Sequence, residues 1–261
     1  MRFSYTRAIT LIYKLRKIMK KLQSTFYALV ILLGLTSVSN VFAGSVSIGV
    51  VASSLGVDGS GSETDRLTAT GANVADTSTR SKSVDETTMT GSVYAEFTSE
   101  TRFPVTFGFE YTPGTANISD KLSRTDTETS QTGQVAATSV SSTRTAEADA
   151  TNFATLYTEL GIWGPLYVRA GLSNMDIDYT TTSTGTNGGA YSEALSVSGT
   201  NLGIGIRGQL DSGLIWKLSY EETDYDAINL RSSGNSVAGE TNAINADVDT
   251  NAYRLSLGKS F

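Results

Sequence analysis

Eight charged residues recur among alternating polar and apolar positions, and their types could support either acid–base chemistry or ion pairing. They are four acids and four bases: Glu96, Glu110, Glu159, Glu221, Arg169, Arg207, Lys217 and Arg254. Two carboxylates held close together can act as general acid and general base, and a chain of titratable groups can relay protons. The same residues can instead neutralise one another, which is the usual state of charges removed from water.

The composition removes most catalytic alternatives. The chain has 261 residues, no His and no Cys. Without His there is no Ser–His nucleophile, and the most common metal ligand is missing. Without Cys there is no thiol nucleophile, disulfide or thiolate metal site. The stretch GIGIRG (203–208) lacks the strand–turn–helix context of a dinucleotide motif. We therefore expect a protein that is not an enzyme and uses no cofactor.

Four aspartates could offer oxygen ligands to Ca²⁺ or Mg²⁺: Asp224, Asp226, Asp247 and Asp249. Oxygen donors are what these cations prefer, but the spacing is not that of an EF-hand loop. Acidic residues at the ends of loops are usually solvated charges. We predict no metal site from these residues.

The first 43 residues differ from the rest in charge and hydropathy. They carry seven of the twenty basic residues and no acid, whereas 44–261 hold thirteen bases and all twenty-six acids. Lys20 and Lys21 precede a ten-residue apolar run, FYALVILLGL (26–35), and small residues follow up to Ala43. This is the pattern of a signal peptide cleaved before Gly44. The run is about half of the roughly 20 residues that a transmembrane helix needs.

Met19 opens a more compact version of the same signal. Residues 1–18 are therefore either an extended basic region or the product of a start codon placed too early, and both interpretations fit. The remaining chain, 44–261, has a net charge of −13. Such an acidic body argues against a nucleic-acid partner, because phosphate binding needs basic patches.

From Gly44 onward, apolar and polar residues alternate, which predicts β-strands with unlike surroundings on their two faces. We expect eight strands, at about 45–55, 88–98, 103–111, 151–161, 166–175, 198–210, 213–221 and 251–261. Short connections (99–102, 162–165, 211–213) alternate with long polar ones (56–87, 112–150, 176–197, 222–249). Four hairpins with short turns at one end and long loops at the other are typical of a transmembrane β-barrel. Ten strands fit as well, because the first two long connections have room for another hairpin.

The last strand carries a regular row of large side chains: Tyr253, Leu255, Leu257 and Phe261. This row resembles the C-terminal signal by which the barrel-assembly machinery recognises outer-membrane barrels. Lys259 departs from that signal, because an aromatic or apolar residue is common there. With the signal peptide and the hairpin layout, 44–261 resembles the small eight-stranded bacterial outer-membrane barrels: the OmpX type, the opacity proteins and the barrel domain of OmpA.

The resemblance implies an all-β, antiparallel, up-and-down transmembrane barrel with four long extracellular loops. It also implies a monomer with both mature termini in the periplasm, surrounded by outer-membrane lipid and lipopolysaccharide. The apolar rows would face lipid, with Tyr253 and Phe261 at the two interfaces. Lys259 lies on the lipid-facing row, and near the strand end its ammonium can reach the headgroups. A position at mid-membrane depth would contradict this register.

The polar rows would then face the lumen and bring the eight charged residues together. We expect a salt-bridge network that closes the barrel rather than a proton path or a catalytic carboxylate pair, because an eight-stranded barrel is just wide enough for side chains to fill it. The predicted function is a non-enzymatic outer-membrane protein that displays polar loops, with a structural, adhesive or interaction role and an unidentified extracellular ligand. The alternative is a small porin-like channel for ions or small solutes, and a third is a soluble secreted β-protein.

Overall fold

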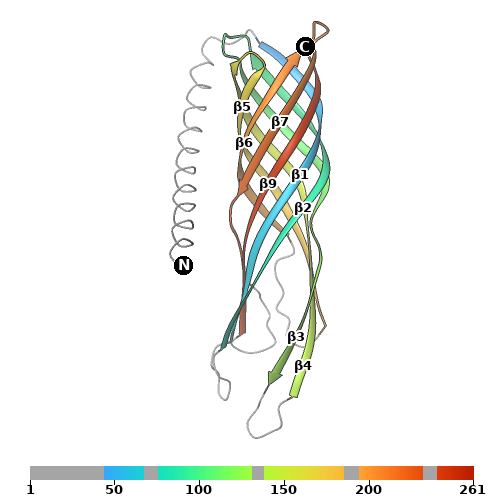
Figure 1. Cartoon of the computed structure of the whole chain (residues 1–261), viewed down its shortest axis with the longest axis vertical. Coiled ribbons are helices and arrows are strands. Elements are labelled where there is room, and N and C mark those ends of the chain that lie inside the picture. The colour runs from blue at the N-terminus through green and yellow to red at the C-terminus, as the bar shows by residue number, and fades with distance from the viewer. Residues whose placement is uncertain (1–43, 68–75, 131–137, 185–193, 232–239) are drawn as a thin grey trace, which may run out of the picture.

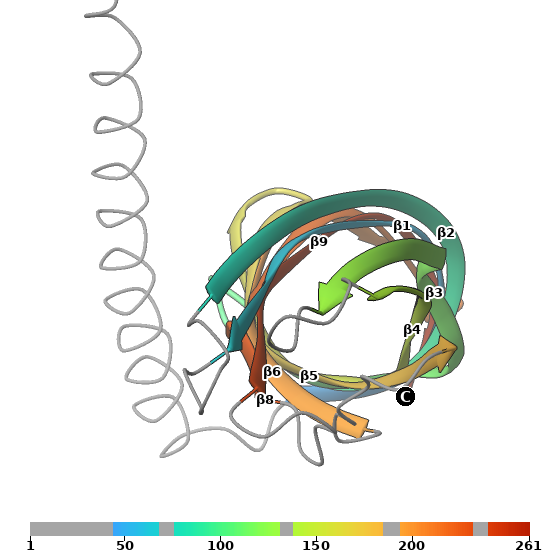
Figure 2. The same cartoon turned by 90° about the horizontal axis from the view of Figure 1, so that it is seen from below.

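The fold of this chain is a single closed antiparallel β-sheet (Figures 1 and 2). The computed structural model describes residues 44–67, 76–130, 138–184, 194–231 and 240–261. Its strands are β1 (Gly44–Leu67), β2 (Asp76–Ser99), β3 (Val105–Ser130), β4 (Thr138–Trp163), β5 (Leu166–Thr184), β6 (Ala194–Gln209), β7 (Leu214–Tyr225), β8 (Ile228–Arg231) and β9 (Glu240–Ser260). None of the residues described here belongs to a helix long and apolar enough to cross a membrane.

Eight of these strands form the ring. Each strand from β1 to β7 pairs with the next along the sequence, β7 pairs with β9, and β9 pairs with β1 to close the sheet. The short strand β8 pairs only with β9. The prediction of an eight-stranded, up-and-down, antiparallel barrel is confirmed. The ten-stranded alternative is wrong for the described residues, because β1 pairs directly with β2 and β3 with β4 along their whole lengths.

The strands are longer than the alternation of apolar residues predicts. The β1–β2 ladder runs without interruption from Gly44↔Ser99 to Leu67↔Asp76, through most of the segment 56–87 that we expected to be a loop. The segments 112–150, 176–197 and 222–249 are likewise strand over much of their length. Ser, Thr and Gly dominate these extensions, and their similar hydropathy hides the two-residue period. The ladder itself satisfies the backbone there.

In the half of the barrel near the short turns, the apolar rows point outward. Large apolar side chains that are exposed include Val46, Ile48, Val50, Val93, Phe107, Phe109, Leu156, Leu172, Ile204, Ile206, Leu218, Leu255 and Leu257. Many buried positions of the same strands are polar or charged, among them Ser47, Ser92, Thr106, Glu110, Arg169, Asn201 and Lys217. A soluble barrel or sandwich has the opposite arrangement.

Farther from the short turns, the ring separates into two sheets. The β2–β3 pairing covers only the six positions from Val93↔Tyr111 to Thr98↔Thr106, and the β6–β7 pairing ends at Gly199↔Tyr225. Beyond these points, β2, β1, β9 and β8 form one sheet, which we call arm 1. Strands β3, β4, β5 and β6 form the other, which we call arm 2. The arms project toward the bottom of Figure 1, away from the C-terminus.

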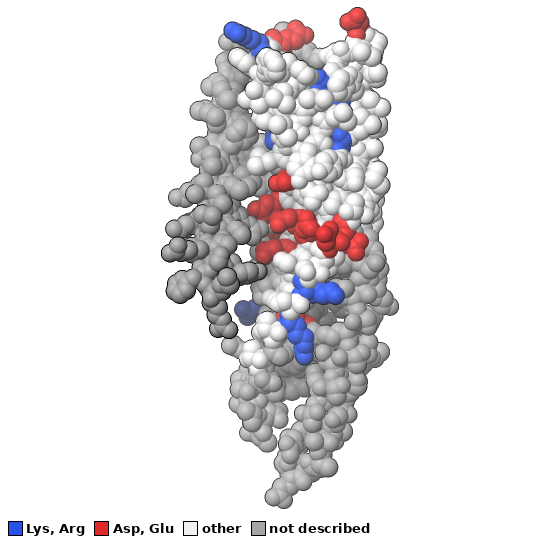
Figure 3. All heavy atoms as spheres, viewed as in Figure 1, with Lys and Arg blue, Asp and Glu red and all other residues white. Residues whose placement is uncertain are grey.

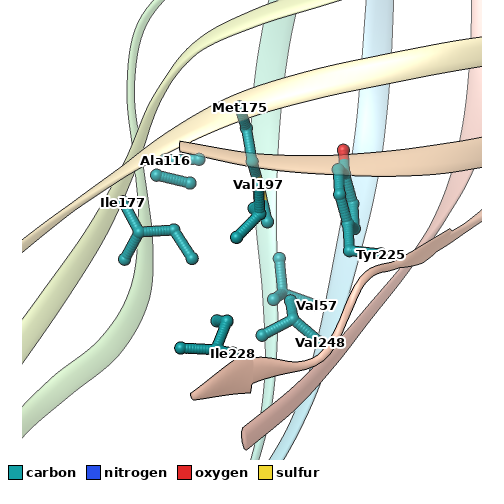
Figure 4. Close-up of a cluster of buried hydrophobic side chains, with 9 residues drawn as sticks. Val57, Ala116, Met175, Ile177, Val197, Tyr225, Ile228 and Val248 are labelled. Atoms are coloured by element: carbon teal, nitrogen blue, oxygen red, sulfur yellow. The ribbon is translucent and has the colours of Figure 1, made fainter. Parts of the chain in front are cut away.

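A buried apolar cluster joins the two arms (Figure 4). Its members are Val57, Tyr225, Ile228 and Val248 from the side of arm 1, and Ala116, Ala150, Met175, Ile177 and Val197 from arm 2. Burial raises the pKa of the Tyr225 phenol well above its ordinary value, while its hydrogen bond to Thr250 acts in the other direction. Tyr225 therefore stays neutral in this cluster.

Glycines allow tyrosine rings to lie flat against neighbouring strands inside the barrel. Tyr94 crosses both Gly49 on β1 and Gly258 on β9, and a Cβ built at Gly49 would lie 2.6 Å from the ring. Gly108 under Tyr157 and Gly205 under Tyr167 repeat the arrangement. The rings thus fill the lumen where the neighbouring strand has no side chain, and this allows a narrow barrel to reach close packing.

Replacing Gly49 by Ala should lower the unfolding free energy by about 1–3 kcal/mol, because the added methyl group overpacks the Tyr94 ring. The measurement is the thermal unfolding midpoint in detergent, which is monitored by the gel shift between folded and heated protein. Gly91→Ala is the control, since a Cβ at Gly91 meets only the Val51 carbonyl oxygen at 3.8 Å. Equal midpoints for the two variants would contradict this account of the packing.

Candidate functional site: a charged lumen

The layer of charges nearer the short turns is centred on Lys217 of β7. Its ammonium binds both oxygens of Glu159 on β4, at 2.9 and 2.8 Å, and also contacts Glu96 on β2. The hydroxyl of Tyr157 donates to the same Glu96 oxygen at 2.6 Å. The Tyr94 and Tyr167 rings lie 5.5 and 5.7 Å from the ammonium, within cation–π range. We call this group the lysine layer.

The second layer is a closed ring of two acids and two bases, which we call the ion ring. Arg169 on β5 reaches Glu110 on β3 at 3.1 Å and Glu221 on β7 at 3.2 Å. Arg254 on β9 reaches Glu221 at 2.6 Å and also contacts Glu110. Each guanidinium therefore bridges both carboxylates, and each carboxylate accepts from both guanidiniums. The ion ring ties four strands together across the lumen.

Neutral polar groups add further contacts to the ion ring, although the buried Nε atoms of Arg169 and Arg254 have no hydrogen-bond partner among the described residues. Ser92 donates to Glu110 at 2.5 Å, and Asn201 donates to Glu221 at 3.3 Å. The guanidinium of Arg169 also stacks on the Tyr157 ring, with Cζ 3.6 Å from its centroid. A carboxylate with several donors and a guanidinium with both ends engaged are the conditions under which a buried ion pair is tolerated.

Burial makes this pairing necessary. Glu159 is 1% exposed, Glu221 2%, and Arg169 and Lys217 each 4%. An isolated charge at such a place costs several kcal/mol of desolvation, so each charge needs a partner of opposite sign. The period of two residues along each strand supplies the partners, because it turns every one of these side chains inward.

The structure brings seven of the eight sequence-predicted charges into these two layers. The exception is Arg207, which is half-buried and donates to the Thr106 hydroxyl at 2.9 Å. Arg169 lies level with Glu159 along the ladder, yet its long side chain reaches the ion ring instead. The sequence reasoning missed the inward tyrosines Tyr94, Tyr157 and Tyr167, although each falls on the same row as a predicted charge.

The C-terminal row lies on the outer face, with Tyr253, Leu255, Leu257 and Phe261 all exposed. The Phe261 N–H donates to the Val46 carbonyl at 2.9 Å, so the end of the chain is held against β1. The Lys259 ammonium contacts the Ser212 carbonyl in the β6–β7 turn, which places it at the turn end of the barrel. Of the predicted cleavage site, Gly44 opens β1, and Ala43 lies outside the described residues.

These contacts decide what the lumen can do chemically. Every carboxylate of the two layers is engaged by a cation, so none is available as a free base. Among the described residues, no group of three or more acids is arranged to hold a metal ion. The lysine layer, the ion ring and the apolar cluster follow one another along the axis of the barrel.

Comparison with known proteins gives structural similarity only. No protein-family model and no curated protein sequence matches this chain. Among solved structures, it is similar to Ail, the attachment invasion locus protein of Yersinia pestis, at 12% identity over 81% of this chain and 97% of that one, with a TM-score of 0.30. The outer membrane protein OprG from Pseudomonas aeruginosa has 10% identity, 84% and 96% coverage and a TM-score of 0.39. Neisserial surface protein A has 7% identity, 79% and 97% coverage and a TM-score of 0.28. At these values the similarity adds nothing to what the strand pairing shows.

Replacing Arg254 by Ala should destabilise the barrel by about 3–5 kcal/mol, because Glu110 and Glu221 each lose a buried cation. Thermal unfolding in detergent measures the loss. Arg102→Ala is the control, since Arg102 is exposed in the β2–β3 turn and lies over the Phe103 ring. Pairing Arg254→Met with Glu110→Gln should recover part of the loss by removing a charge of each sign. An unfolding midpoint for Arg254→Ala like that of the control would contradict a stabilising ion ring.

Proposed function

We propose that residues 44–261 form a closed outer-membrane barrel that anchors and displays two β-sheet arms at the surface of a Gram-negative bacterium, with a structural, adhesive or interaction role and no catalytic one. The observation that carries the proposal is the inverted barrel wall near the short turns, where apolar side chains are exposed and charges are buried. Such a wall is unstable in water and favourable in lipid, because burial of apolar surface drives insertion.

The height of the apolar wall supports this placement. Eight residue steps separate Tyr253 from Phe261, and at about 3.4 Å per step and about 40° of tilt they rise roughly 21 Å. This is close to the apolar band of about 25 Å in outer-membrane barrels. Exposed aromatic rings at both ends, Tyr253 and Phe261, suit the two interfaces.

A row of acids marks the end of the apolar wall that lies farther from the short turns. Four aspartates lie directly opposite one another on neighbouring strands: Asp224↔Asp249, Asp249↔Asp58 and Asp58↔Asp85. Figure 3 shows acidic atoms in one band across this face, with mostly uncharged atoms between the band and the turn end. Ionised side chains on the lipid face are costly, so this row belongs outside the hydrocarbon, among headgroups and water.

The orientation follows from the connections. Outer-membrane barrels have short turns in the periplasm and longer connections outside. This rule puts the turns at Glu100–Arg102 and Asp211–Gly213, and both ends of the mature chain, in the periplasm. The arms then project from the cell, surrounded at their base by lipid and lipopolysaccharide. The signal-like segment and the C-terminal row support export and recognition by the barrel-assembly machinery, and a monomer is expected.

The closed state is preferred over a channel because three successive layers obstruct the axis. The lysine layer and the ion ring consist of mutually paired charges, and the apolar cluster lies beyond them. Moving an ion past the ion ring would require breaking ion pairs that are buried away from water, which costs several kcal/mol.

Reconstituted into planar bilayers, the folded protein should show no steady single-channel conductance, because two layers of mutually paired charges and an apolar cluster lie across the axis. A general diffusion porin in the same bilayers is the positive control. A reproducible unitary conductance would overturn the closed-barrel proposal and favour the channel alternative. A detergent-free soluble monomer without a heat-modifiable gel band would instead favour the soluble β-protein.

Because the chain has no cysteine, single cysteines report orientation without background. Ser83→Cys on arm 1 should react with a membrane-impermeant maleimide on intact cells. Ser212→Cys in the β6–β7 turn should react only after the outer membrane is permeabilised. Both are exposed serines, so they form a matched pair. The reverse labelling pattern would show that the arms face the periplasm.

A further inference from the structure

Strand β2 has a long edge with no neighbouring strand. Its pairing with β3 begins at Val93 and runs toward the short turn, whereas its pairing with β1 continues to Asp76. Between Ser81 and Thr88, β2 therefore pairs on one side only. The described part of the chain provides no strand on the other side of this segment. Along that side, the backbone N–H and C=O groups are available to a further strand.

This edge is unusually regular. The β1–β2 ladder has no register shift, whereas the β3–β4 ladder shifts at Thr112/Thr115, Asn117/Ser119 and Ser119/Leu122. The segment 81–88 also contains no proline. Bulges, prolines and charged side chains are the devices that normally prevent a free edge from pairing with another chain, and this segment has only the charges. An edge protected by charge alone can add a strand whose charges are complementary.

The charges on this segment suggest which strand it would accept. Lys82, Val84 and Glu86 fall on one face, since side chains alternate along a strand. Lys82 is exposed and Glu86 half-buried, and neither has an ion-pair partner among the described residues. A strand added to the edge would gain from a carboxylate opposite Lys82 and a base opposite Glu86, because directly opposed unlike charges stabilise neighbouring strands.

We propose that the β2 edge from Ser81 to Thr88 is a docking site for an extended segment of another protein, which adds to arm 1 as an antiparallel strand. In that direction the incoming segment has its basic residue four positions before its acidic residue. Antiparallel addition is preferred because its hydrogen bonds are slightly more favourable than those of a parallel pair. The inference rests on the proposed display role, since the edge must lie outside the hydrocarbon. Asp85, within the edge and part of the acid row, is consistent with that position.

Two synthetic peptides of the same composition test the proposal on the full-length folded protein in detergent micelles. The matching peptide is Thr-Lys-Thr-Val-Thr-Glu-Thr, and the second exchanges its Lys and Glu. The matching peptide should bind about three- to tenfold more tightly in fluorescence titration, since two cross-strand charge pairs change sign between them. Exchanging the charges of the protein, with Lys82→Glu and Glu86→Lys together, should reverse the preference. Arg231→Glu, on the opposite edge of arm 1, is the control and should leave both affinities unchanged.

Failure to bind either peptide, or a preference that survives the exchange, would overturn the proposal. A peptide-free dimer that the exchange abolishes would also overturn it, because a second copy would then occupy the edge. These results are separable from failure of the proposed function. A heat-modifiable, non-conducting barrel that binds no peptide contradicts strand addition and leaves the closed, displayed barrel intact.

Discussion

The ion ring of Glu110, Arg169, Glu221 and Arg254 is the interaction on which the half of the barrel near the short turns depends. With apolar side chains on the outside of the wall, the alternation of each strand sends the polar residues inward, whatever their charge. Inside, they cannot be solvated, so they must neutralise one another. The ion ring achieves this with two bridging guanidiniums and two bridging carboxylates. The fork of a guanidinium suits the task because it can donate to two carboxylates at once.

The barrel reverses its polarity along its length. On the turn side of the acid row, the outer face is apolar and the lumen is charged. On the other side, the outer face carries exposed polar residues such as Ser60, Ser83 and Asp247, and the interior is the apolar cluster. The same strands therefore form an apolar outer wall at one end and two sheets packed around an apolar interior, as in a sandwich, at the other. The change coincides with the point where the ring opens into two arms.

The sequence predicted the part of the fold in which hydropathy alternates strongly. Leu255 and Leu257 against Arg254 and Ser256 define a strand and its two faces without any structure. The extensions were missed because Ser, Thr and Gly on both faces give no contrast. Met175 and Ile177 could have indicated the extension of β5, because these apolar residues lie on the same face of the strand as Arg169. The bulge at Asn152, whose φ is 54°, has no comparable signature.

The charged lumen was predictable as a set of inward residues and not as a set of contacts. The alternation of side chains along β6 assigns Arg207 to the lumen. Only the reach of its side chain and the position of Thr106 explain why it lies apart from both layers. The same limit applies to Arg169, whose backbone lies level with one layer while its guanidinium belongs to the other. Contacts across a lumen depend on shear and tilt, which alternation along single strands does not contain.

The pairing of β1 with β9 has a consequence for the order in which the barrel can form. These strands are the first and the last of the described chain, yet their ladder extends from Ser47↔Ser260 to Leu67↔Glu240. Without β9, β1 and β7 would both expose unpaired backbone groups, which the hydrocarbon of the proposed membrane setting could not satisfy. Contacts so distant along the chain also form slowly, because closing a long loop costs entropy before any pairing is gained. The ring therefore closes only when its last strand meets its first, and a partial barrel in the proposed membrane setting would keep two unsatisfied edges.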